Sequence, residues 1–381
     1  MKVKTLAILI IVLAVLTGVV FAVLMQHSSR EGKRELGTPL LKNLPANDIA
    51  SVTILGGDGN EVRLSQAGKR WVVKERFGYP ADFSKLVEFV RKLKDAKIGR
   101  SFAASEKALK RLHLKDPGDK EAKKEEKGTA IILADANGKP LVHLIIGEAM
   151  KGGKGGFFPE GQYVMVGNRK TVYLIDKQFE GLGQTPTEWL KKDLIDVKED
   201  DIKEIACVDP DGKTTRFAFR RPEKGKDLEP VGLPSGEKIK RPSVNRLAGA
   251  LSGLELEDVI DPAKAGEIMG MANSPKIEYH LFNGMIYDLY PGSKCKEGEV
   301  CYLKVAVRYQ QPTPLKTAAK EAPKKEGNEE KAGDVEKTME KKAETLNKEL
   351  GRWTYTIPRW KHDALATDLA SFLEKEKKKG S

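Results

Sequence analysis

The chain has 381 residues, a length that favours two folded units over one. Hydrophobic residues make up 40% of it and charged residues 32%, so it holds enough apolar material for packed cores and is not disordered as a whole. The net charge of +12 would suit a polyanionic partner, but basic and acidic residues alternate along the chain, which favours an ordinary solvated surface. Nucleic-acid binding is not expected, because the basic residues are not clustered with aromatic platforms.

An uncharged apolar run covers residues 5–25, directly after the Met-Lys-Val-Lys start. At 1.5 Å per residue, a helix of this length crosses a hydrocarbon core of about 30 Å. We therefore expect residues 1–28 to form a cytoplasmic tip and a single-pass anchor in the bacterial inner membrane, with the bulk of the chain periplasmic or extracellular. A signal peptide cleaved near residues 20–22 is the alternative, although the run is longer than the apolar part of such peptides.

A linker over residues 29–47 leads to a first α+β module over residues 48–198. It opens with a β-hairpin that turns at Gly57-Asp58-Gly59. Asp82 then suits the N-cap of an amphipathic helix. We predict that its apolar face packs into the core and is no groove for a partner. The apolar positions are Phe83, Leu86, Val87, Val90 and Leu93.

The first module continues with a second hairpin, whose strands at 130–134 and 141–146 flank Asn137-Gly138. This dipeptide is typical of a type I′ turn, in which both central residues need positive φ. Strands at 163–166 and 171–175 and a short helix at 187–192 close the module. The glycine-rich segment 152–156 resembles a phosphate-binding loop, but no helix follows it, so we interpret it as a flexible connection.

The same series recurs over residues 199–377, which we interpret as a divergent copy of the module. A hairpin turns at Asp211-Gly212, a helix follows Pro242-Ser243, and a second Asn-Gly hairpin turns at Asn283-Gly284. Strands at 302–307 and 353–357 and a helix at 363–375 complete it. The expected fold class is α+β: a transmembrane helix, then two copies of a mostly antiparallel β-sheet plus helix module.

The second copy carries a low-complexity insertion over residues 311–350, where the first has a tight turn. Its charges balance and its apolar residues are sparse, so we expect disorder with a fraying helix near residues 334–350. A docking helix is the alternative.

Cysteine usage points to one candidate disulfide, between Cys295 and Cys301, which would close a hairpin loop; two reduced thiols are the alternative. Cys207 lies in a strand pattern and is interpreted as a small buried hydrophobe. The five histidines lie at no zinc-ligand spacing from other ligands, so no metal site is expected.

Known catalytic motifs are missing from the sequence, and we expect no catalytic residues, no cofactor and no enzymatic activity. Six aromatic residues could form a carbohydrate or peptide surface, but their periodic positions favour core packing. These are Trp71, Tyr79, Trp189, Trp353, Tyr355 and Trp360.

Several segments of the first 200 residues carry a family resemblance. They are residues 49–54, 71–73, 79–82, 112–117, 135–147, 163–164, 172–174, 189–190 and 194–196. In these segments the chain resembles a bacterial domain-of-unknown-function family, DUF4340, whose genes often sit beside those of gliding-motility-type ABC transporter components. The resemblance implies a membrane-anchored protein with an ABC permease or gliding-motility-type subunits as partners, and it brings no catalytic residues.

Three functions follow as hypotheses. The first is a non-enzymatic extracytoplasmic accessory or binding component of an ABC-type transport complex. The second is an envelope scaffold whose basic surface binds an acidic wall or lipid polymer. The third, an unrecognised hydrolase, would require a concave site with convergent carboxylates or histidines.

Overall fold

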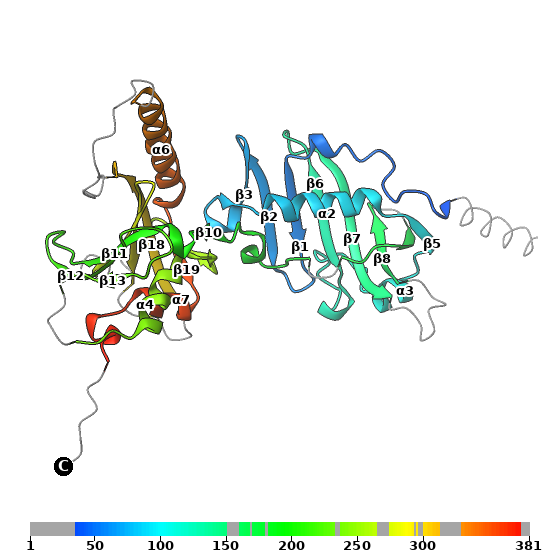
Figure 1. The fold of residues 1–381 in the computed structure, drawn as a ribbon. Helices are drawn as coiled ribbons and strands as arrows, with labels where there is room; N and C mark the ends of the chain where they lie inside the picture. The colour runs from blue at the N-terminus through cyan, green and yellow to red at the C-terminus, as the bar shows by residue number, and fades with distance from the viewer. Residues whose placement is uncertain are drawn as a thin grey trace, which may run out of the picture. The chain divides into compact units, whose positions relative to one another are not determined.

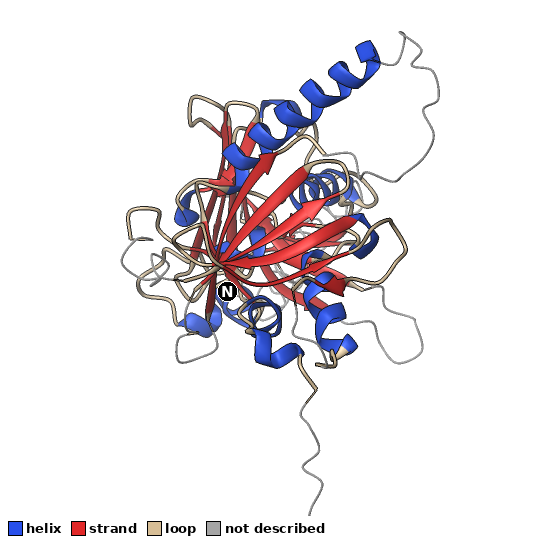
Figure 2. Cartoon of the chain, turned by 60° about the vertical axis from the view of Figure 1, so that its left-hand side comes forward, coloured by secondary structure: helices blue, strands red, loops and turns tan. Residues whose placement is uncertain are grey.

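The computed structural model describes residues 35–150, 160–167, 170–179, 182–232, 237–264, 274–292, 295, 300–312 and 329–374. The expected anchor at residues 5–25 and the glycine-rich segment 152–156 lie outside these ranges. In the described part of the chain, no helix is long and apolar enough to cross a membrane. Strands make up most of the regular structure and helices are few, so the protein is α+β with mostly antiparallel sheets (Figure 2).

The chain divides into two compact units, Met1–Lys191 and Lys192–Ser381. The division precedes the expected module boundary at residues 198 and 199, because the short strand β10 (Asp193–Ile195) pairs with β14 (Leu254–Glu255) of the second unit. Part of the expected linker is also ordered: Leu40 is buried, and its N–H donates to the carbonyl of Ala96. Residues 37–40 thus belong to the first unit and do not act as a free linker.

The first unit contains a nine-stranded sheet in the order β4-β3-β2-β1-β6-β7-β8-β9-β5. Helix α2 connects the two edge strands β4 and β5 and crosses one face of the sheet (Figure 1). The elements are β1 (Ser51–Leu55), β2 (Glu61–Ala67), β3 (Arg70–Val73), β4 (Tyr79–Pro80), α2 (Phe83–Asp95), β5 (Ile98–Ala103), α3 (Glu106–Arg111), β6 (Thr129–Ala134), β7 (Pro140–Met150), β8 (Gly161–Val166) and β9 (Thr171–Ile175), with short 3₁₀ helices at Ala46–Asp48, Lys74–Arg76, Lys124–Glu126 and Pro186–Trp189.

The core of the first unit follows from the alternation of its strands. Val52 lies opposite Leu64 on β2 and opposite Leu133 on β6, and all three are fully buried. Side chains directly opposite on antiparallel strands share one face, so these residues form a continuous apolar surface. A second cluster contains Leu112, Leu114, Ile145 and Val172. Ile145 follows Leu144 on β7 and so points to the opposite face, which means that the sheet is buried on both sides at this end.

The second unit contains an eight-stranded sheet in the order β13-β12-β11-β16-β17-β18-β19-β15. Helix α4 connects β13 to β14 and β15, and α7 follows β19. The remaining elements are β11 (Ile202–Val208), β12 (Thr215–Arg220), β13 (Glu229–Pro230), α4 (Arg241–Ala248), β15 (Asp258–Val259), β16 (Lys276–Leu281), β17 (Met285–Pro291), β18 (Cys301–Tyr309), α6 (Glu329–Leu350), β19 (Thr354–Ile357) and α7 (Arg359–Leu365), with 3₁₀ helices at Glu199–Asp201, Gly249–Leu251 and Leu369–Phe372.

Several aromatic residues pack among the aliphatic residues of the core of the second unit. Tyr279 is fully buried on β16, and its hydroxyl donates to the carbonyl of Leu247 on α4 at 2.8 Å. Phe372 packs edge-on against Phe217 and Phe219 of β12. The closing helix was expected over residues 363–375, but the chain forms α7 at Arg359–Leu365 and a separate 3₁₀ turn that carries Phe372 into the core.

Helix α6 lies where a fraying helix was expected near residues 334–350, and its contact with the sheet corresponds to the docking-helix alternative; the expectation of disorder for residues 313–328 lies outside the described residues. Residues 329–350 form a helix of 22 residues that contacts β18, and Ala343 is 2% exposed. Ala343 shares its face of the helix with the partly buried Met339, Leu346 and Leu350, which form a sparse apolar stripe among charged residues.

The Asn-Gly turns also differ from expectation. Gly138 and Gly284 have φ of 78° and 86°, whereas neither Asn137 nor Asn283 has positive φ. A type I′ turn would need both, so these turns are of the type in which glycine alone takes the left-handed conformation after a type I turn. Next to the first turn the strand register shifts between Leu133 and Ala134, as expected for the bulge that accompanies this turn.

Candidate functional site

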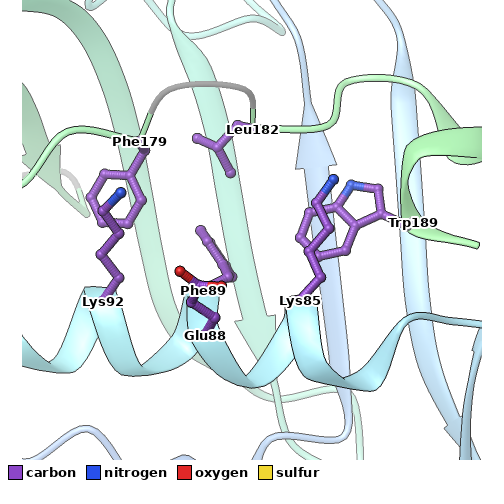
Figure 3. Close-up of a pocket in the computed structure, with 7 residues that line it drawn as sticks. All are labelled: Lys85, Glu88, Phe89, Lys92, Phe179, Leu182 and Trp189. Atoms are coloured by element: carbon purple, nitrogen blue, oxygen red, sulfur yellow. The ribbon is translucent and has the colours of Figure 1, made fainter. Parts of the chain in front are cut away.

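The first unit has a cavity of about 180 Å³. It lies between helix α2 and the chain around Phe179, Leu182 and Trp189, which leads into and through the 3₁₀ helix Pro186–Trp189. Phe89 on α2 forms the centre of its apolar surface, and its ring lies edge-on to Phe179 at 5.9 Å and to Trp189 at 6.1 Å. Figure 3 shows the α2 side chains rising toward Phe179, Leu182 and Trp189. A cavity of this size holds one large side chain and is smaller than ordinary small-molecule sites, which span roughly 300–1,000 Å³.

Hydrogen bonds hold the segment opposite α2 in place. The buried side chain of Gln162 accepts from the N–H of Phe179 at 2.6 Å and donates to the carbonyl of Gly147 at 3.0 Å. The Trp189 indole N–H donates to the carbonyl of Gly183 at 2.7 Å. A Cβ on Gly183 would lie 2.7 Å from this nitrogen, so glycine allows the close approach. These hydrogen bonds hold Phe179 and Trp189 in place without a bound ligand.

The start of α2 is tied to the same segment. Asp82 caps the helix by accepting from the N–H of Lys85, and its own N–H donates to the carbonyl of Trp189 at 2.8 Å. Asp82 is the N-cap that the sequence predicted.

Two ammonium groups border the cavity. Lys85 Nζ lies 4.9 Å from the centre of the Trp189 ring, and Lys92 Nζ lies 5.6 Å from that of Phe179. Both are within the range of cation–π attraction. Lys85 also donates to the carbonyl of Glu188 at 2.9 Å. Among the described residues of the lining, Glu88 is the one carboxylate, against the two ammonium groups of Lys85 and Lys92.

The exposed face of α2 overturns one prediction. Phe83 and Val87 were expected in the core, but their exposed fractions are 58% and 46%. The buried residues of the helix are Leu86, Phe89 and Leu93. Phe83 and Val87 are four residues apart and share a face, so α2 presents an apolar strip to solvent, on a different side of the helix from Lys85, Phe89 and Lys92, which line the cavity. An apolar stripe in the sequence does not reveal which part of it meets the sheet.

Four of the six aromatic residues singled out in the sequence lie in the cores as predicted: Tyr79, Trp189, Trp353 and Tyr355. Trp71 is partly buried. Trp360 on α7 is 67% exposed, and Nζ of the neighbouring Lys361 lies 4.7 Å from its ring centre.

The second unit holds the candidate cysteine pair. Cys295 and Cys301 form a disulfide between the end of β17 and the start of β18. His362 of α7 is 4% exposed, and its Nδ1 lies 3.4 Å from Cys295 Sγ. Sequence spacing gave no sign of this neighbour, which is 67 positions away. Cys207 is buried as predicted, and burial raises the pKa of its thiol to about 11.

Charged residues form a network on the sheet face of the second unit opposite Tyr279. Glu278 contacts Lys276 at 2.6 Å, His280 at 2.9 Å and Arg308 at 3.1 Å. Arg308 also donates to Asp288, which is 4% exposed. The hydrogen bond from His280 is the main cause that lowers the pKa of Glu278 to about 2, with Lys276 and Arg308 adding to it. No single sequence motif marked this network, although the alternation of β16 places its three members on one face.

These features define an α+β protein with two antiparallel sheets and an apolar, cation-bordered cavity beside the helix that crosses the first sheet. The model of the family described as "Domain of unknown function (DUF4340)" matches residues 71–270, and the chain belongs to this family. The matched region includes the whole cavity lining. Comparison with curated proteins and with solved structures found no match.

Proposed function

We propose that this protein is a non-enzymatic accessory component of an ABC-type transport complex. In this proposal residues 5–25 anchor the chain in the bacterial inner membrane, and the two units lie outside the cytoplasm. The uncharged run of 21 residues supports the anchor. The expectation of an ABC-type partner comes from the family resemblance.

The exposed apolar strip of α2 is the observation that carries the binding role. Phe83 and Val87 remain in solvent at 58% and 46% exposure, and the cavity bordered by Lys85 and Lys92 lies on the same helix. Exposed aromatic and aliphatic residues that share one helix face are typical of surfaces that bind a protein partner, and the preformed pocket on another face of the same helix could receive an anchor side chain of that partner. The small cavity volume favours a side chain over a metabolite.

The charges on α2 specify the partner further. The helix carries four basic residues, Lys85, Arg91, Lys92 and Lys94, against the two acidic residues Glu88 and Asp95. We infer that the bound segment belongs to a membrane subunit and offers one large apolar side chain next to carboxylates. Such charge complementarity governs the association rate and the salt dependence of binding.

We also infer that the two units are divergent copies of one module. In the first sheet the order β2-β1-β6-β7-β8-β9-β5 matches β12-β11-β16-β17-β18-β19-β15 of the second, strand for strand along the chain. A helix follows the third or fourth strand in each, α2 in one and α4 in the other. The apolar strip lies on α2 of the first copy, so a partner that contacts the strip binds the first copy.

The experiment is a crosslinked affinity purification of the full-length protein from its native membrane, read by mass spectrometry. We compare the wild type, the double variant Phe83→Asp/Val87→Asp, and Ser84→Asp, which adds a charge at an exposed neighbouring position of the same helix. We expect ABC permease and ATPase subunits with the wild type and with Ser84→Asp, and at least a tenfold loss with the double variant.

A form lacking residues 1–25 separates the alternatives. Loss of the transporter subunits with this form supports the membrane-bound accessory role. Recovery of acidic wall or lipid polymer by both the anchored and the shortened form would replace it with the envelope-scaffold function. Recovery of neither transporter subunits nor polymer by the wild type would refute the proposed function.

A further inference from the structure

Three metal-ligating side chains of the second unit converge at one place in the fold. Cys295 follows β17, Cys301 begins β18, and His362 lies in the middle of α7. Their ligand atoms, the two Sγ atoms and a ring nitrogen, all lie within 4.8 Å of one another. They come from two segments about 60 residues apart in sequence, so the fold itself assembles the cluster.

The orientation of His362 suits it to bind a metal. Its Nε2 lies 2.8 Å from the carbonyl oxygen of Gly292. A carbonyl only accepts, so Nε2 carries the hydrogen and donates, and Nδ1 of the neutral ring presents its lone pair. That lone pair faces Cys295 Sγ at 3.4 Å. A histidine whose second nitrogen donates to a backbone carbonyl is the usual arrangement in metal sites, because the hydrogen bond fixes both the tautomer and the ring.

The three side chains of the cluster differ in their exposure to solvent. Cys301 is 0% exposed and His362 is 4% exposed, whereas Cys295 is partly exposed. Water is thus excluded from two of the three ligands, and a reductant can reach the third. Asp363, whose Oδ1 lies 3.7 Å from His362 Nδ1, is within reach as a further oxygen ligand.

We propose that Cys295, Cys301 and His362 form a zinc site that binds the metal only when the disulfide is reduced. The disulfide is its closed state, in which the sulfurs are bonded to each other. A dithiol reductant opens it: the Cys295–Cys301 bond breaks, two thiols form, and the dithiol becomes a disulfide. Zn²⁺ then binds both sulfurs as thiolates and His362 Nδ1, with release of two protons, and water or Asp363 fills the fourth position. Two thiolates and an imidazole are the donor set that Zn²⁺ prefers in tetrahedral sites.

The two states differ in what they connect. The disulfide closes only the loop between β17 and β18, whereas zinc also links that loop to α7. Zinc binding therefore restrains α7 and the residues around Trp360 on it. This site is independent of the proposed docking surface, which lies on the first unit.

The test uses the full-length protein in detergent, in the oxidised form and in a form reduced with dithiothreitol and freed of it under anaerobic conditions. Each form is titrated with Co²⁺ and Zn²⁺ alone. We expect one equivalent of Co²⁺ in the reduced form only, with the thiolate charge-transfer and tetrahedral d–d absorption bands, displaced by Zn²⁺. Cys295→Ser and Cys301→Ser should abolish the bands, and His362→Gln should weaken binding by more than about 10- to 100-fold, the loss that follows even when only a residue hydrogen-bonded to a ligand is removed.

Matched controls are Cys207→Ala, which removes the free buried cysteine, and His143→Gln, which changes a histidine of the first unit. Both should bind Co²⁺ like the wild type. A readout on the wild type alone covers the case in which His362→Gln fails to fold: Zn²⁺ should slow alkylation of Cys295 and Cys301, located by mass spectrometry, at least tenfold. The proposal is overturned if the reduced wild type binds no more metal than Cys295→Ser, or if Zn²⁺ leaves the alkylation rates unchanged.

Discussion

The side chain of Asn347 on helix α6 accepts a hydrogen bond at 3.0 Å from the backbone N–H of Val307 on strand β18. Strand β19 pairs with β18 from Cys301 to Lys304, so within the described part of the chain the later part of β18 has no pairing strand on that side. Helix α6 lies along this stretch instead. An open strand edge invites pairing with other chains, and a covering helix is one way in which proteins prevent it.

We expect that Ala343→Asp will destabilise the second unit by about 3 kcal/mol or more, because a carboxylate would replace a buried methyl group against β18. Asn347→Ala should cost about 1 kcal/mol, the usual value of one hydrogen bond. Lys342→Ala, at an exposed position of the same helix, is the control. Urea unfolding and hydrogen exchange of β18 measure both effects. Unchanged exchange in the Ala343→Asp variant would show that α6 does not protect the strand.

The alternation of apolar residues was sufficient to predict most strands and their antiparallel pairing, because a half-buried strand must repeat every second residue. It was not sufficient for α6. The inner face of that helix carries the buried Ala343 and the partly buried Met339, Leu346 and Leu350, and this stripe is sparse among Lys and Glu, so the sequence did not show that it meets a strand. The predicted type of the two Asn-Gly turns was also wrong. Glycine after asparagine fits both a type I′ turn and a type I turn followed by a left-handed residue, so the dipeptide does not distinguish them.

Glu278 should make the stability of the second unit sensitive to acid. Its folded pKa, about 2, lies below the ordinary value near 4.5, because the carboxylate accepts from His280 and contacts Lys276 and Arg308. A lowered pKa means that the unfolded state binds the proton more readily. The stabilisation is therefore fully present above about pH 4.5 and is lost as the pH falls from there toward 2. Its size is on the order of 2–3 kcal/mol.

Urea unfolding of the second unit at pH 6, 4 and 2.5 measures this effect. Glu278→Gln should lower stability at pH 6 and flatten the loss between pH 4.5 and 2. Glu344→Gln, at an exposed position of α6, should keep the pH dependence of the wild type. The prediction fails if Glu278→Gln and the wild type lose stability in parallel over this range.

Trp189 should contribute strongly to the stability of the first unit around the cavity. Its side chain is 1% exposed, and its indole donates to Gly183. Trp189→Ala should cost about 3–5 kcal/mol in the free energy of unfolding, as for other large buried aromatic residues. Trp189→Phe should cost about 1–2 kcal/mol, since the carbonyl of Gly183 loses its donor.

Trp360→Ala provides the comparison, because Trp360 is 67% exposed and its removal should change stability by less than about 0.5 kcal/mol. Thermal unfolding followed by circular dichroism gives all three values. Equal costs for Trp189→Ala and Trp360→Ala would contradict the packing described for the cavity.

The candidate sites were less predictable than the fold, for a physical reason. Phe83 and Val87 belong to an apolar stripe that is wider than the part of α2 that meets the sheet, and a stripe alone does not locate its contact line. His362 is 67 positions from Cys295, and only the pairing of β18 with β19 and the return of the chain through α7 bring it there. Spacing rules describe ligands on one local element and miss those joined by tertiary structure.

The two Asn-Gly hairpins provide a matched pair for the last prediction. Gly138 and Gly284 both have positive φ, but a Cβ at Gly138 would meet nothing within 4 Å. A Cβ at Gly284 would lie 2.6 Å from the carbonyl oxygen of Gln310, whose own N–H donates to Gly284. Gly138→Ala should therefore cost only the backbone strain of about 1 kcal/mol, whereas Gly284→Ala should cost about 3 kcal/mol or more because the backbone must also move.

Hydrogen exchange read peptide by peptide separates the two effects, since each substitution reports on its own hairpin. We expect much faster exchange in β16 and β17 of Gly284→Ala, and a small change in β6 and β7 of Gly138→Ala. Comparable losses in the two variants would mean that conformational strain alone decides the cost and that the contact with Gln310 adds nothing. A larger loss at Gly284 would show that this glycine is required by the close approach of the chain after β18, in addition to its turn.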